Sequence, residues 1–480
     1  MRLKSLYIKD YNILQNFSID FTSNLSVFIG ENGSGKSSII ECLAYIFGHL
    51  HKYFILNDKT AEFIDSYKIN YAINGLDIYI ESRYVESESN TFTPIIKING
   101  SEMSTSQLKN AYADFSFLPT KIVLSYSGIT ERLKLLNNHF ENKFIKKIIR
   151  KDNPFSLNPL ILPPDNPFVY IKKEYVSFIL LALFVLNTND ANKFLETLGI
   201  DINGCTTTIT LKKPYWAKSN KKPKEGTSIW GITGKIAQDL LEGLDAIAIR
   251  SSYEQKEKQD KIEYELYGSI MVQDLFSSYY NLDSSQVVSF LDTLLCDDLL
   301  EAVNITWDKN FSVDKLSEGE KQMILSVGLS LVLNEKNILF LLDEPDVSLH
   351  PKWQQEFISN FRKGLNDDSM AVITTHSPSI ASDLNEHSLC LIRKGKIITK
   401  SFKYYGKRVD DILCDYFGLD STRNKDVASR LEKLWTMVHN DQYNSPEFRT
   451  MKKELSQIIG FDDPEIIAIN RDILRKECEK

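Results

Sequence analysis

The sequence predicts an α/β protein in which a mixed sheet is covered by helices. Three short apolar runs, Leu25–Ile29, Ile338–Leu342 and Met370–Thr375, have the length and the bounded character of buried strands. They alternate with stretches whose apolar residues recur at helical spacing, which is typical of a sheet with helices packed on it. A large α+β region at 51–299 interrupts this pattern, and residues 405–480 read as helical.

The overall composition excludes several classes of protein. Of the 480 residues, 42% are hydrophobic and 25% are charged, which excludes collagen-like, low-complexity and wholly disordered chains. The formal net charge is −7, so contact with nucleic acid would need a local basic patch. The six cysteines lie too far apart for a CxxC redox pair or a zinc knuckle.

The sequence also carries information on location. No apolar run with a small-residue cleavage site follows Met1, so we expect no secretion signal. The longest near-continuous apolar stretch, Tyr175–Leu186, is shorter than the roughly 20 residues that span a bilayer and predicts a buried helix. We therefore expect a cytoplasmic protein that does not act at a membrane.

The predicted elements follow one another in chain order. Strands over Leu3–Ile8 and Phe17–Phe21 precede a helix over Ile39–Phe47, with Gly48 placed as its C-cap. The Asn74-Gly75 turn predicts a hairpin over Tyr67–Tyr84. Residues from about 130 to 200 read as helices broken by an extended, proline-rich crossover, and Ala302–Trp307 reads as a further strand of the helix-covered sheet. The prolines of that crossover are Pro159, Pro163, Pro164 and Pro167.

The segment from Gly30 to Ser37 reads Gly-Glu-Asn-Gly-Ser-Gly-Lys-Ser, follows an apolar strand and opens a helix, which is the context of a phosphate-binding loop. Small residues let backbone amides curl around phosphate oxygens, and the helix N-terminus favours negative charge. Lys36 would reach the β- and γ-phosphates of ATP, and Ser37 would ligate Mg²⁺. The predicted nucleotide-binding residues here are Gly30, Asn32, Gly33, Ser34, Gly35, Lys36, Ser37 and Ser38.

Two further strands end in residues that suit hydrolysis. Asp343 and Glu344 follow the run Ile338–Leu342, so Asp343 would hold Mg²⁺ while Glu344 would deprotonate the attacking water. His376 follows the run Met370–Thr375 and would act beside them. Lys36, Glu344 and His376 are thus the predicted catalytic residues.

A fourth motif runs from Leu316 to Glu320 and precedes a helical apolar pattern. Ser317 and Glu320 also form a capping-box pattern, so a plain helix start explains them equally well. The four motifs together, in this order, resemble the Walker A, signature, Walker B and switch-histidine motifs of ABC-type ATPases. In that superfamily two heads dimerise head to tail around two ATP molecules, which implies that Ser317 and Gly319 contact the nucleotide held by a partner copy.

Lys36 and Asp343 are separated by many more residues than the corresponding motifs of the compact ATPase of an ABC transporter, so we do not expect a transporter head. The run from Asp343 to Pro351 is similar to the corresponding loop of overcoming-lysogenization-defect-like and RecF-like ATPases. Within that group, three segments resemble PtuA-type ATPases of Septu antiphage systems and of related retrons: Lys121–Gly128, Lys315–Gln322 and Tyr405–Leu413.

This resemblance implies an organisation and a set of partners. The ATPase head would be discontinuous, over 1–50 and 300–404, and the insertion at 51–299 would return a strand and loop near 121–128 to it. The helical residues 405–480 would hold an HNH-type nuclease, and the ATPase would form a homodimer or a higher homo-oligomer that meets DNA through the complex. We expect no nuclease on this chain, because Asp410-Asp411 and Asp462-Asp463 follow no apolar strand.

Several alternatives remain open at this point. A RecF-like repair or recombination ATPase would bind DNA directly, and a solvated loop or a DNA contact both explain the lysines between Lys212 and Lys224 around Tyr215 and Trp216. Tyr126-Ser127-Gly128 stands where ABC heads usually place a glutamine, so hydrolysis would be slow. The helically spaced apolar residues of the C-terminal region would pack internally or bind a partner. They are Val427, Leu431, Leu434, Val438, Leu455, Ile458 and Ile459.

Overall fold

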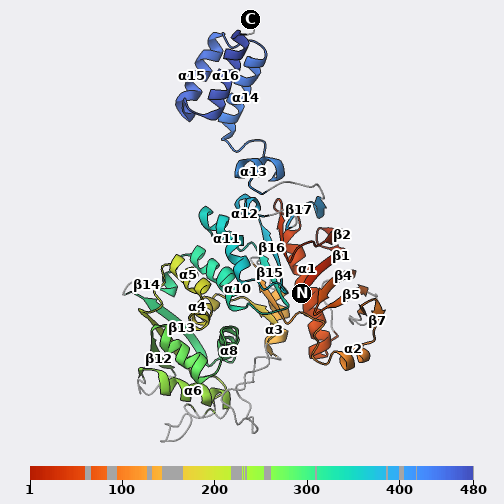
Figure 1. The fold of residues 1–480 in the computed structure, drawn as a ribbon, viewed down its shortest axis with the longest axis vertical. Helices are drawn as coiled ribbons and strands as arrows, with labels where there is room; N and C mark the ends of the chain where they lie inside the picture. The colour runs from red at the N-terminus through yellow and green to blue at the C-terminus, as the bar shows by residue number, and fades with distance from the viewer. Residues whose placement is uncertain are drawn as a thin grey trace. The chain divides into compact units, whose positions relative to one another are not determined.

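A computed structural model describes residues 1–59, 66–83, 94–126, 132–142, 166–217, 230, 232, 235–252, 261–308, 311–384, 388–398, 405–417 and 419–478. The chain forms two compact units, Met1–Gly406 and Lys407–Lys480 (Figure 1). The first unit combines sheets with helices and the second is helical. The predicted α/β class, a mixed sheet covered by helices, is confirmed.

A seven-stranded sheet in the order β18-β17-β3-β16-β15-β8-β9 forms the centre of the first unit. All neighbouring strands are parallel except β17 and β18. The carboxyl ends of the parallel strands therefore meet at one edge of the sheet. The strands are β3 (Leu25–Ile29), β8 (Lys121–Ser125), β9 (Phe168–Tyr170), β15 (Ile338–Asp343), β16 (Met370–Thr375), β17 (Leu389–Arg393) and β18 (Lys396–Ile398).

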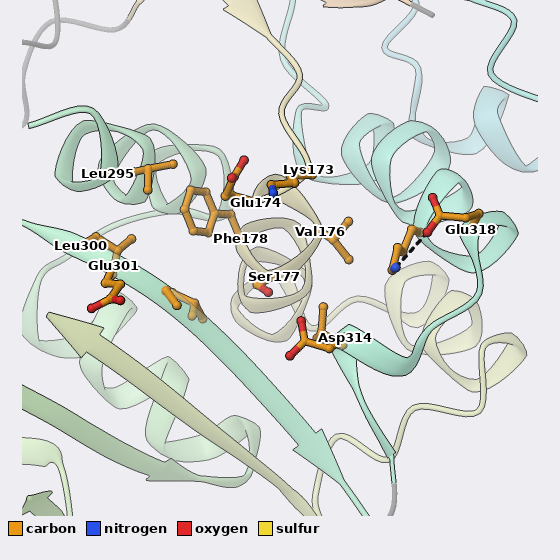
Figure 2. A pocket seen from close by; sticks show the side chains of 14 residues that line it. Lys173, Glu174, Val176, Ser177, Phe178, Leu295, Leu300, Glu301, Asp314 and Glu318 are labelled. Atoms are coloured by element: carbon orange, nitrogen blue, oxygen red, sulfur yellow. Dashed lines mark hydrogen bonds and ion pairs between the residues drawn. The ribbon is translucent and has the colours of Figure 1, made fainter. Parts of the chain in front are cut away.

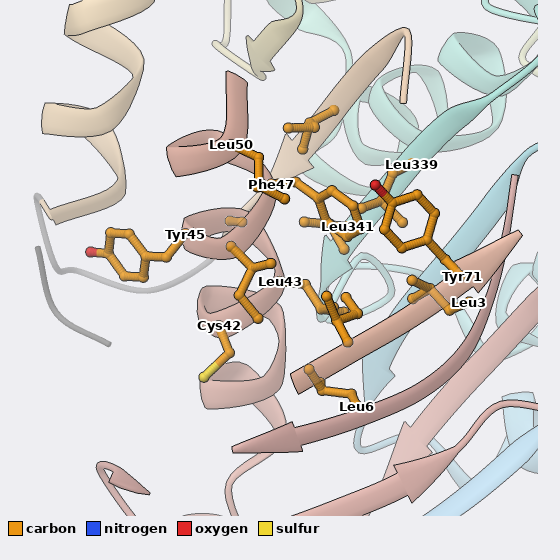
Figure 3. Packing of buried hydrophobic residues seen from close by; sticks show 14 of the residues in the cluster. Leu3, Leu6, Cys42, Leu43, Tyr45, Phe47, Leu50, Tyr71, Leu339 and Leu341 are labelled. Atoms are coloured by element: carbon orange, nitrogen blue, oxygen red, sulfur yellow. The ribbon is translucent and has the colours of Figure 1, made fainter. Parts of the chain in front are cut away.

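Helix α1 (Lys36–His51) lies between this sheet and a six-stranded antiparallel sheet, as Figure 3 shows. Leu43, Phe47 and Leu50 of α1 belong to one buried cluster with Leu339 and Leu341 of β15 and with residues of the second sheet. The strands of that second sheet are β1 (Arg2–Tyr11), β2 (Leu14–Asp20), β4 (Ser66–Ile73), β5 (Leu76–Arg83), β6 (Ile95–Ile98) and β7 (Ser101–Glu102). The predicted strands near the N-terminus and the hairpin at Asn74-Gly75 are confirmed.

The prediction that Gly48 ends the first helix is wrong. Helix α1 runs past it to His51, continues as η1 (Lys52–Leu56), and ends where Asn57 has a φ of 54°. Gly48 instead marks a close contact, because a Cβ there would lie 2.7 Å from Cδ2 of Leu136 in α3 (Arg132–Phe140). By length and composition Lys36–Leu56 would suffice to cross a membrane, but 89% of its apolar 18-residue window is buried inside the protein, as in a core helix.

Helices cover the opposite face of the seven-stranded sheet (Figure 1). Phe340 points away from Leu339 and Leu341 along β15 and packs edge-on against Phe361 of α11 (Pro351–Gly364), with ring centroids 5.7 Å apart. The same layer contains α9 (Glu318–Met323), η6 (Ile324–Gly328), α10 (Leu329–Val332) and α12 (Pro378–Ser382).

A third sheet, antiparallel and in the order β11-β12-β10-β13-β14, belongs to an inserted lobe made of the described residues within 175–315. The prediction that Ala302–Trp307 extends the helix-covered sheet is wrong, because β13 pairs with β10 of the insertion. Tyr175–Leu186 is the buried helix that the sequence predicts. The lobe contains β10 (Cys205–Lys212), β11 (Arg250–Ser252), β12 (Lys261–Tyr267), β13 (Leu300–Trp307), β14 (Phe311–Ser312), α4 (Tyr175–Leu186), α5 (Asn189–Thr197), α6 (Lys235–Ile247), α7 (Gly268–Gln273), η4 (Asp274–Tyr279), α8 (Ser284–Cys296) and η5 (Val313–Lys315). The remaining short helix of the first unit is α2 (Thr105–Ala111).

The second unit consists of α13 (Val409–Phe417), α14 (Lys425–His439), α15 (Pro446–Ile459) and α16 (Pro464–Cys478). Most of the apolar residues singled out in the sequence pack within it. Leu431, Leu434, Val438 and Leu455 are buried in its core, and Val427 and Ile459 pack against that core, while Ile458 is exposed. Internal packing therefore accounts for most of this pattern.

Some predictions fall on residues outside the described ranges. These residues are Ser127, Gly128, Pro159, Pro163, Pro164, Lys218, Lys221, Lys222 and Lys224.

The contact between α10 and α11 leads to a stability prediction. A Cβ on Gly364 would lie 2.4 Å from the backbone nitrogen of Leu331, so Gly364→Ala forces the two backbones apart. We expect the free energy of unfolding to fall by about 1–3 kcal/mol, measured by denaturant titration followed by circular dichroism. Ser359→Ala, on the exposed side of α11, is the control and should change it by less than about 0.5 kcal/mol. Equal stability of the Gly364 variant would show that the helices separate without cost.

Candidate active site

The glycine loop between β3 and α1 has a backbone that larger residues would not permit. Gly35 precedes the first residue of α1 with a φ of 108°, a left-handed conformation that favours glycine. A Cβ on Gly30 would lie 2.2 Å from the carbonyl oxygen of Ile392 in β17. The loop therefore packs tightly between α1 and β17. The amides of the first turn of α1 face the carboxyl edge of the sheet.

Lys36 is the first residue of α1 and its side chain folds back over the loop. Its Nζ donates to the carbonyl oxygens of Gly30 at 3.0 Å and Glu31 at 3.1 Å, and lies 3.5 Å from Nδ1 of His376. Burial lowers the pKa of Lys36 to about 8, although the charges of Glu344 and Asp343 act in the opposite direction. The lysine is thus held at the site by neutral acceptors that phosphate oxygens could replace.

Two neighbouring strands position the carboxylates. Asp343 ends β15 and is buried, and its Oδ1 accepts a hydrogen bond of 2.6 Å from Oγ1 of Thr374 in β16. Glu344 has a φ of 50°, which is rare for a residue with a Cβ, and its amide donates to the carbonyl oxygen of Thr374 at 3.0 Å. Thr374 therefore fixes both carboxylate residues, a role that the sequence analysis did not assign to it.

His376 connects the carboxylate to the lysine. Its Nε2 lies 2.8 Å from Oε1 of Glu344. Burial, and then the charge of Lys36, lower the pKa of His376, so the ring is neutral near pH 7. In a neutral ring that donates from Nε2 to Glu344, Nδ1 is left as the acceptor for Lys36. The three predicted catalytic residues, from three different segments of the chain, thus form one hydrogen-bonded chain.

The signature residues lie at the start of α9. Ser317 is its N-cap: its Oγ accepts from the amide of Glu320 at 3.3 Å, and the Glu320 carboxylate accepts from the amide of Ser317 at 2.7 Å. A Cβ on Gly319 would lie 2.7 Å from the carbonyl oxygen of Ser348, so the helix packs tightly on the loop that follows β15. Among the described residues, neither Ser317 nor Gly319 hydrogen-bonds to the glycine loop. Within one chain these residues have a structural role.

Tyr126 is the first residue of the segment that stands where ABC heads usually place a glutamine, and its side chain hydrogen-bonds to α1. Its hydroxyl donates to Oε1 of Glu41, and Tyr11 donates to Oε2 of the same carboxylate at 2.5 Å. Glu41 is buried one turn beyond Ser37 on α1. No local pattern predicts this contact, because the three residues come from separate elements.

Asp346 is a second residue that the sequence analysis did not place in the site. It is buried, and its Oδ2 accepts from Oγ1 of Thr375 at 2.7 Å, while its Oδ1 has no hydrogen-bond partner in the part of the chain that the structure describes. Burial raises the pKa of Asp346 to about 6. Thr375 directly precedes His376, so this contact ties the loop after β15 to the histidine.

The donor set fits a nucleoside triphosphate with Mg²⁺. Ser34 Oγ is buried in the loop and has no hydrogen-bond partner among the described residues, which leaves a donor available to a phosphate oxygen. Ser37 begins the helix beside Lys36, and Asp343 supplies a buried carboxylate. Within the described residues no cluster of three or more His, Cys, Asp or Glu could hold a metal ion alone, so Mg²⁺ would share Ser37 and Asp343 with phosphate oxygens.

A separate cavity of about 390 Å³ is bounded by α4, α8, α9 and β13 (Figure 2). Charged side chains at its rim include Lys321 and Glu318, which form an ion pair of 3.0 Å. None of the residues that line it belongs to the glycine loop or to the chain formed by Lys36, His376 and Glu344. It is not part of the candidate active site.

A glycine loop before a helix, a buried lysine and two carboxylates at the carboxyl edge of a parallel sheet define a P-loop nucleoside triphosphatase. The chain belongs to the AAA ATPase domain family, whose model matches residues 1–381.

The chain is also similar to ATPases of retrons and to a Septu protein. The chain is 22% identical to the retron Ec83 probable ATPase of Escherichia coli, over 100% of this chain and 88% of that protein. It is 22% identical to the retron Vc95 probable ATPase of Vibrio cholerae, over 94% and 86%. It is 32% identical to the Septu protein PtuA of Bacillus thuringiensis, over 18% and 24%. The predicted resemblance to PtuA-type and retron ATPases is confirmed.

The lowered pKa of Lys36 predicts that ATP binding takes up a proton in alkaline solution. With a pKa of about 8, Lys36 is mostly neutral at about pH 9 in the free protein, and bound phosphates would raise its pKa. We expect uptake of nearly one proton at about pH 9 and little at about pH 7, measured by titration calorimetry in buffers of different ionisation enthalpy. Lys36→Arg, which stays charged at both pH values, is the control. Uptake that persists in this variant would assign the proton to another group.

Proposed function

We propose that this chain is the ATP-binding and ATP-hydrolysing subunit of an antiphage defence complex, in which it dimerises around ATP and regulates an associated HNH-type nuclease. The hydrogen-bonded chain of Lys36, His376 and Glu344 beside the glycine loop is the observation that carries the ATPase part. The defence part is supported by the retron and Septu names of the relatives.

The residues divide the work of hydrolysis among them. The amides of the glycine loop and of the first turn of α1 would hold the phosphates, and Lys36 would exchange its carbonyl acceptors for phosphate oxygens. Ser37 and Asp343 would hold Mg²⁺, which supplies neutralisation of phosphate charge.

Glu344 would take the proton of the attacking water. The water oxygen bonds to the γ-phosphorus, the bond from that phosphorus to the bridging oxygen of ADP breaks, and the water proton passes to the Glu344 carboxylate. His376 would keep this carboxylate in place through its Nε2–H. Tyr126 bonds to Glu41, so its side chain would not position the water, and we expect slow turnover.

Ser317 and Gly319 would act in trans, at the nucleotide of a second copy. Both begin α9, and Ser317 is exposed on this chain, which is consistent with a contact made only in the dimer. The C-terminal helices would hold the nuclease, and DNA would be reached through the complex. We propose no nuclease site on this chain: among the candidate acidic pairs, Asp463 is held by Arg423 at 2.9 Å.

Direct DNA binding of the RecF type finds less support in the described residues. Lys212 pairs with Asp298 at 2.5 Å, and Trp216 Nε1 donates to the carbonyl oxygen of Asp297 at 2.8 Å. These side chains are engaged within the protein rather than presented to a phosphate backbone.

Glu344→Gln tests the hydrolysis mechanism. Glutamine keeps an acceptor for His376 but cannot accept the water proton, so we expect ATP turnover to fall by about 100-fold or more while ATP affinity stays the same. Phosphate release and nucleotide titration measure the two quantities. Glu356→Gln, on the exposed surface of α11, is the matched control. Equal turnover in the parent and Glu344→Gln would remove Glu344 as the base.

A pair of substitutions at Ser317 separates helix capping from a contact in trans. Ser317→Ala loses the cap, which lowers the free energy of unfolding by about 1 kcal/mol, whereas Ser317→Asp keeps a capping oxygen but would repel a γ-phosphate. In the background of Glu344→Gln, we expect ATP to produce a dimer in sedimentation velocity and Ser317→Asp to abolish it at nearly unchanged melting temperature. A normal ATP-dependent dimer of Ser317→Asp would leave Ser317 with the capping role alone.

The regulatory part needs the assembled complex. We expect DNA cutting only when this chain is copurified with its nuclease, and a change in cutting when Glu344→Gln holds ATP. ATP-dependent DNA binding by the isolated chain, without any partner, would favour the repair-type alternative.

A further inference from the structure

The C-terminal unit contains a hollow of about 410 Å³ between α15, α16 and the turn that joins them. Phe448 and Ile466 are buried beneath it, and Ile473 packs against the same core. Phe461 also lines it and is 69% exposed, held in the turn that follows Gly460. The hollow therefore combines an apolar floor with an aromatic side chain exposed to solvent.

The charged residues that line this hollow are all cations: Arg449, Lys452 and Lys453. Arg449 and Lys453 are exposed and form no ion pair with any residue in the described parts of the chain. The Nζ of Lys452 lies 5.9 Å from the centre of the Phe448 ring, and burial lowers the pKa of this lysine. The rest of the lining is neutral, so nothing within the hollow compensates the positive charge.

Four other cations in the described part of the same unit form ion pairs, unlike Arg449 and Lys453. Ion pairs join Arg423 to Asp463, Arg430 to Asp426, Lys433 to Glu447, and Lys476 to Asp441. A cluster of unpaired cations beside apolar surface matches a ligand that carries both carboxylates and a large apolar side chain.

The charge of the whole unit favours a peptide over nucleic acid. Residues 407–480 contain thirteen lysines and arginines but fifteen aspartates and glutamates. Nucleic-acid sites extend a basic stripe along several phosphates, whereas here three cations surround one concave pocket. The volume suits one aromatic or leucine side chain with its neighbours.

We propose that this hollow is a docking site for an acidic peptide segment of another protein. One large apolar side chain of the segment enters beside Phe448 and Phe461, and its carboxylates pair with Arg449, Lys452 and Lys453. The site lies wholly within the second unit, so the proposal does not depend on whether Glu344 hydrolyses ATP.

The probe is a fluorescein-labelled peptide of twelve residues that contains one tryptophan, one leucine and four glutamates, with a second peptide that has lysine in place of each glutamate. Anisotropy with the full chain should show saturable binding of the acidic peptide and none of the basic one. Arg449→Glu combined with Lys453→Glu should weaken binding at least tenfold, and Phe461→Ala should also weaken it.

Lys425→Glu, an exposed charge reversal at the start of α14, is the matched control and should leave binding unchanged. ATP turnover should be the same in all these variants, so a failure of the proposed ATPase and a failure of this site are read separately. The proposal would be overturned if the parent chain did not bind the acidic peptide. It would also be overturned if Lys425→Glu weakened binding as much as the Arg449/Lys453 double variant does. If a labelled DNA duplex bound more tightly than the acidic peptide, and the double variant lost this binding, the hollow would be a nucleic-acid site and the proposal would be overturned.

Discussion

The parallel pairing of β15 with β16 is the constraint on which the site depends. Their register sets Asp343 opposite Thr374, so one threonine bonds both the Asp343 carboxylate and the amide of Glu344. This bonding holds Glu344 in a left-handed backbone that costs of order 1–3 kcal/mol if left unsupported. Since β16 also pairs in parallel with β3, the same register brings the glycine loop and His376 to one edge.

Burial of charge at that edge shapes how the site responds to a ligand. Lys36, nearly enclosed, has two carboxylates nearby but bonds to carbonyl oxygens and faces a neutral histidine. Burial of this cation is costly and lowers its pKa, although the charges of Glu344 and Asp343 act in the opposite direction. Phosphate oxygens would replace the carbonyl oxygens as acceptors for Lys36 and would bring further negative charge close to it. A bound nucleotide would therefore stabilise the charged form of Lys36.

Sequence reasoning found what local patterns encode. Short bounded apolar runs identified β3, β15 and β16, and the glycine loop with Lys36 follows from residue types that few other structures need. The pairing partner of a strand is not encoded locally, so the sequence does not show that Ala302–Trp307 pairs with β10 of the third sheet. The predicted helix end at Gly48 is wrong for a related reason. A helix C-cap and a close contact between helices both favour glycine, and only the position of Leu136 distinguishes them. Thr374 and Asp346 act through contacts across strands that no spacing rule predicts.

The contact of Tyr126 with Glu41 joins separate elements of the first unit beside the glycine loop. In ABC-type heads a glutamine after this strand would face the metal and the water, and a tyrosine bonded to α1 cannot do so while the bond persists. The carboxylate of Glu41 also accepts from Tyr11 of β1, so one buried group joins the end of β8, helix α1 and the six-stranded sheet. Hydrogen bonds to a buried carboxylate are worth about 1.5–3 kcal/mol each, enough to keep this junction closed in the free protein. This junction supports the proposal made above that turnover would be slow and that the bound state of ATP, rather than its rate of hydrolysis, would control a partner.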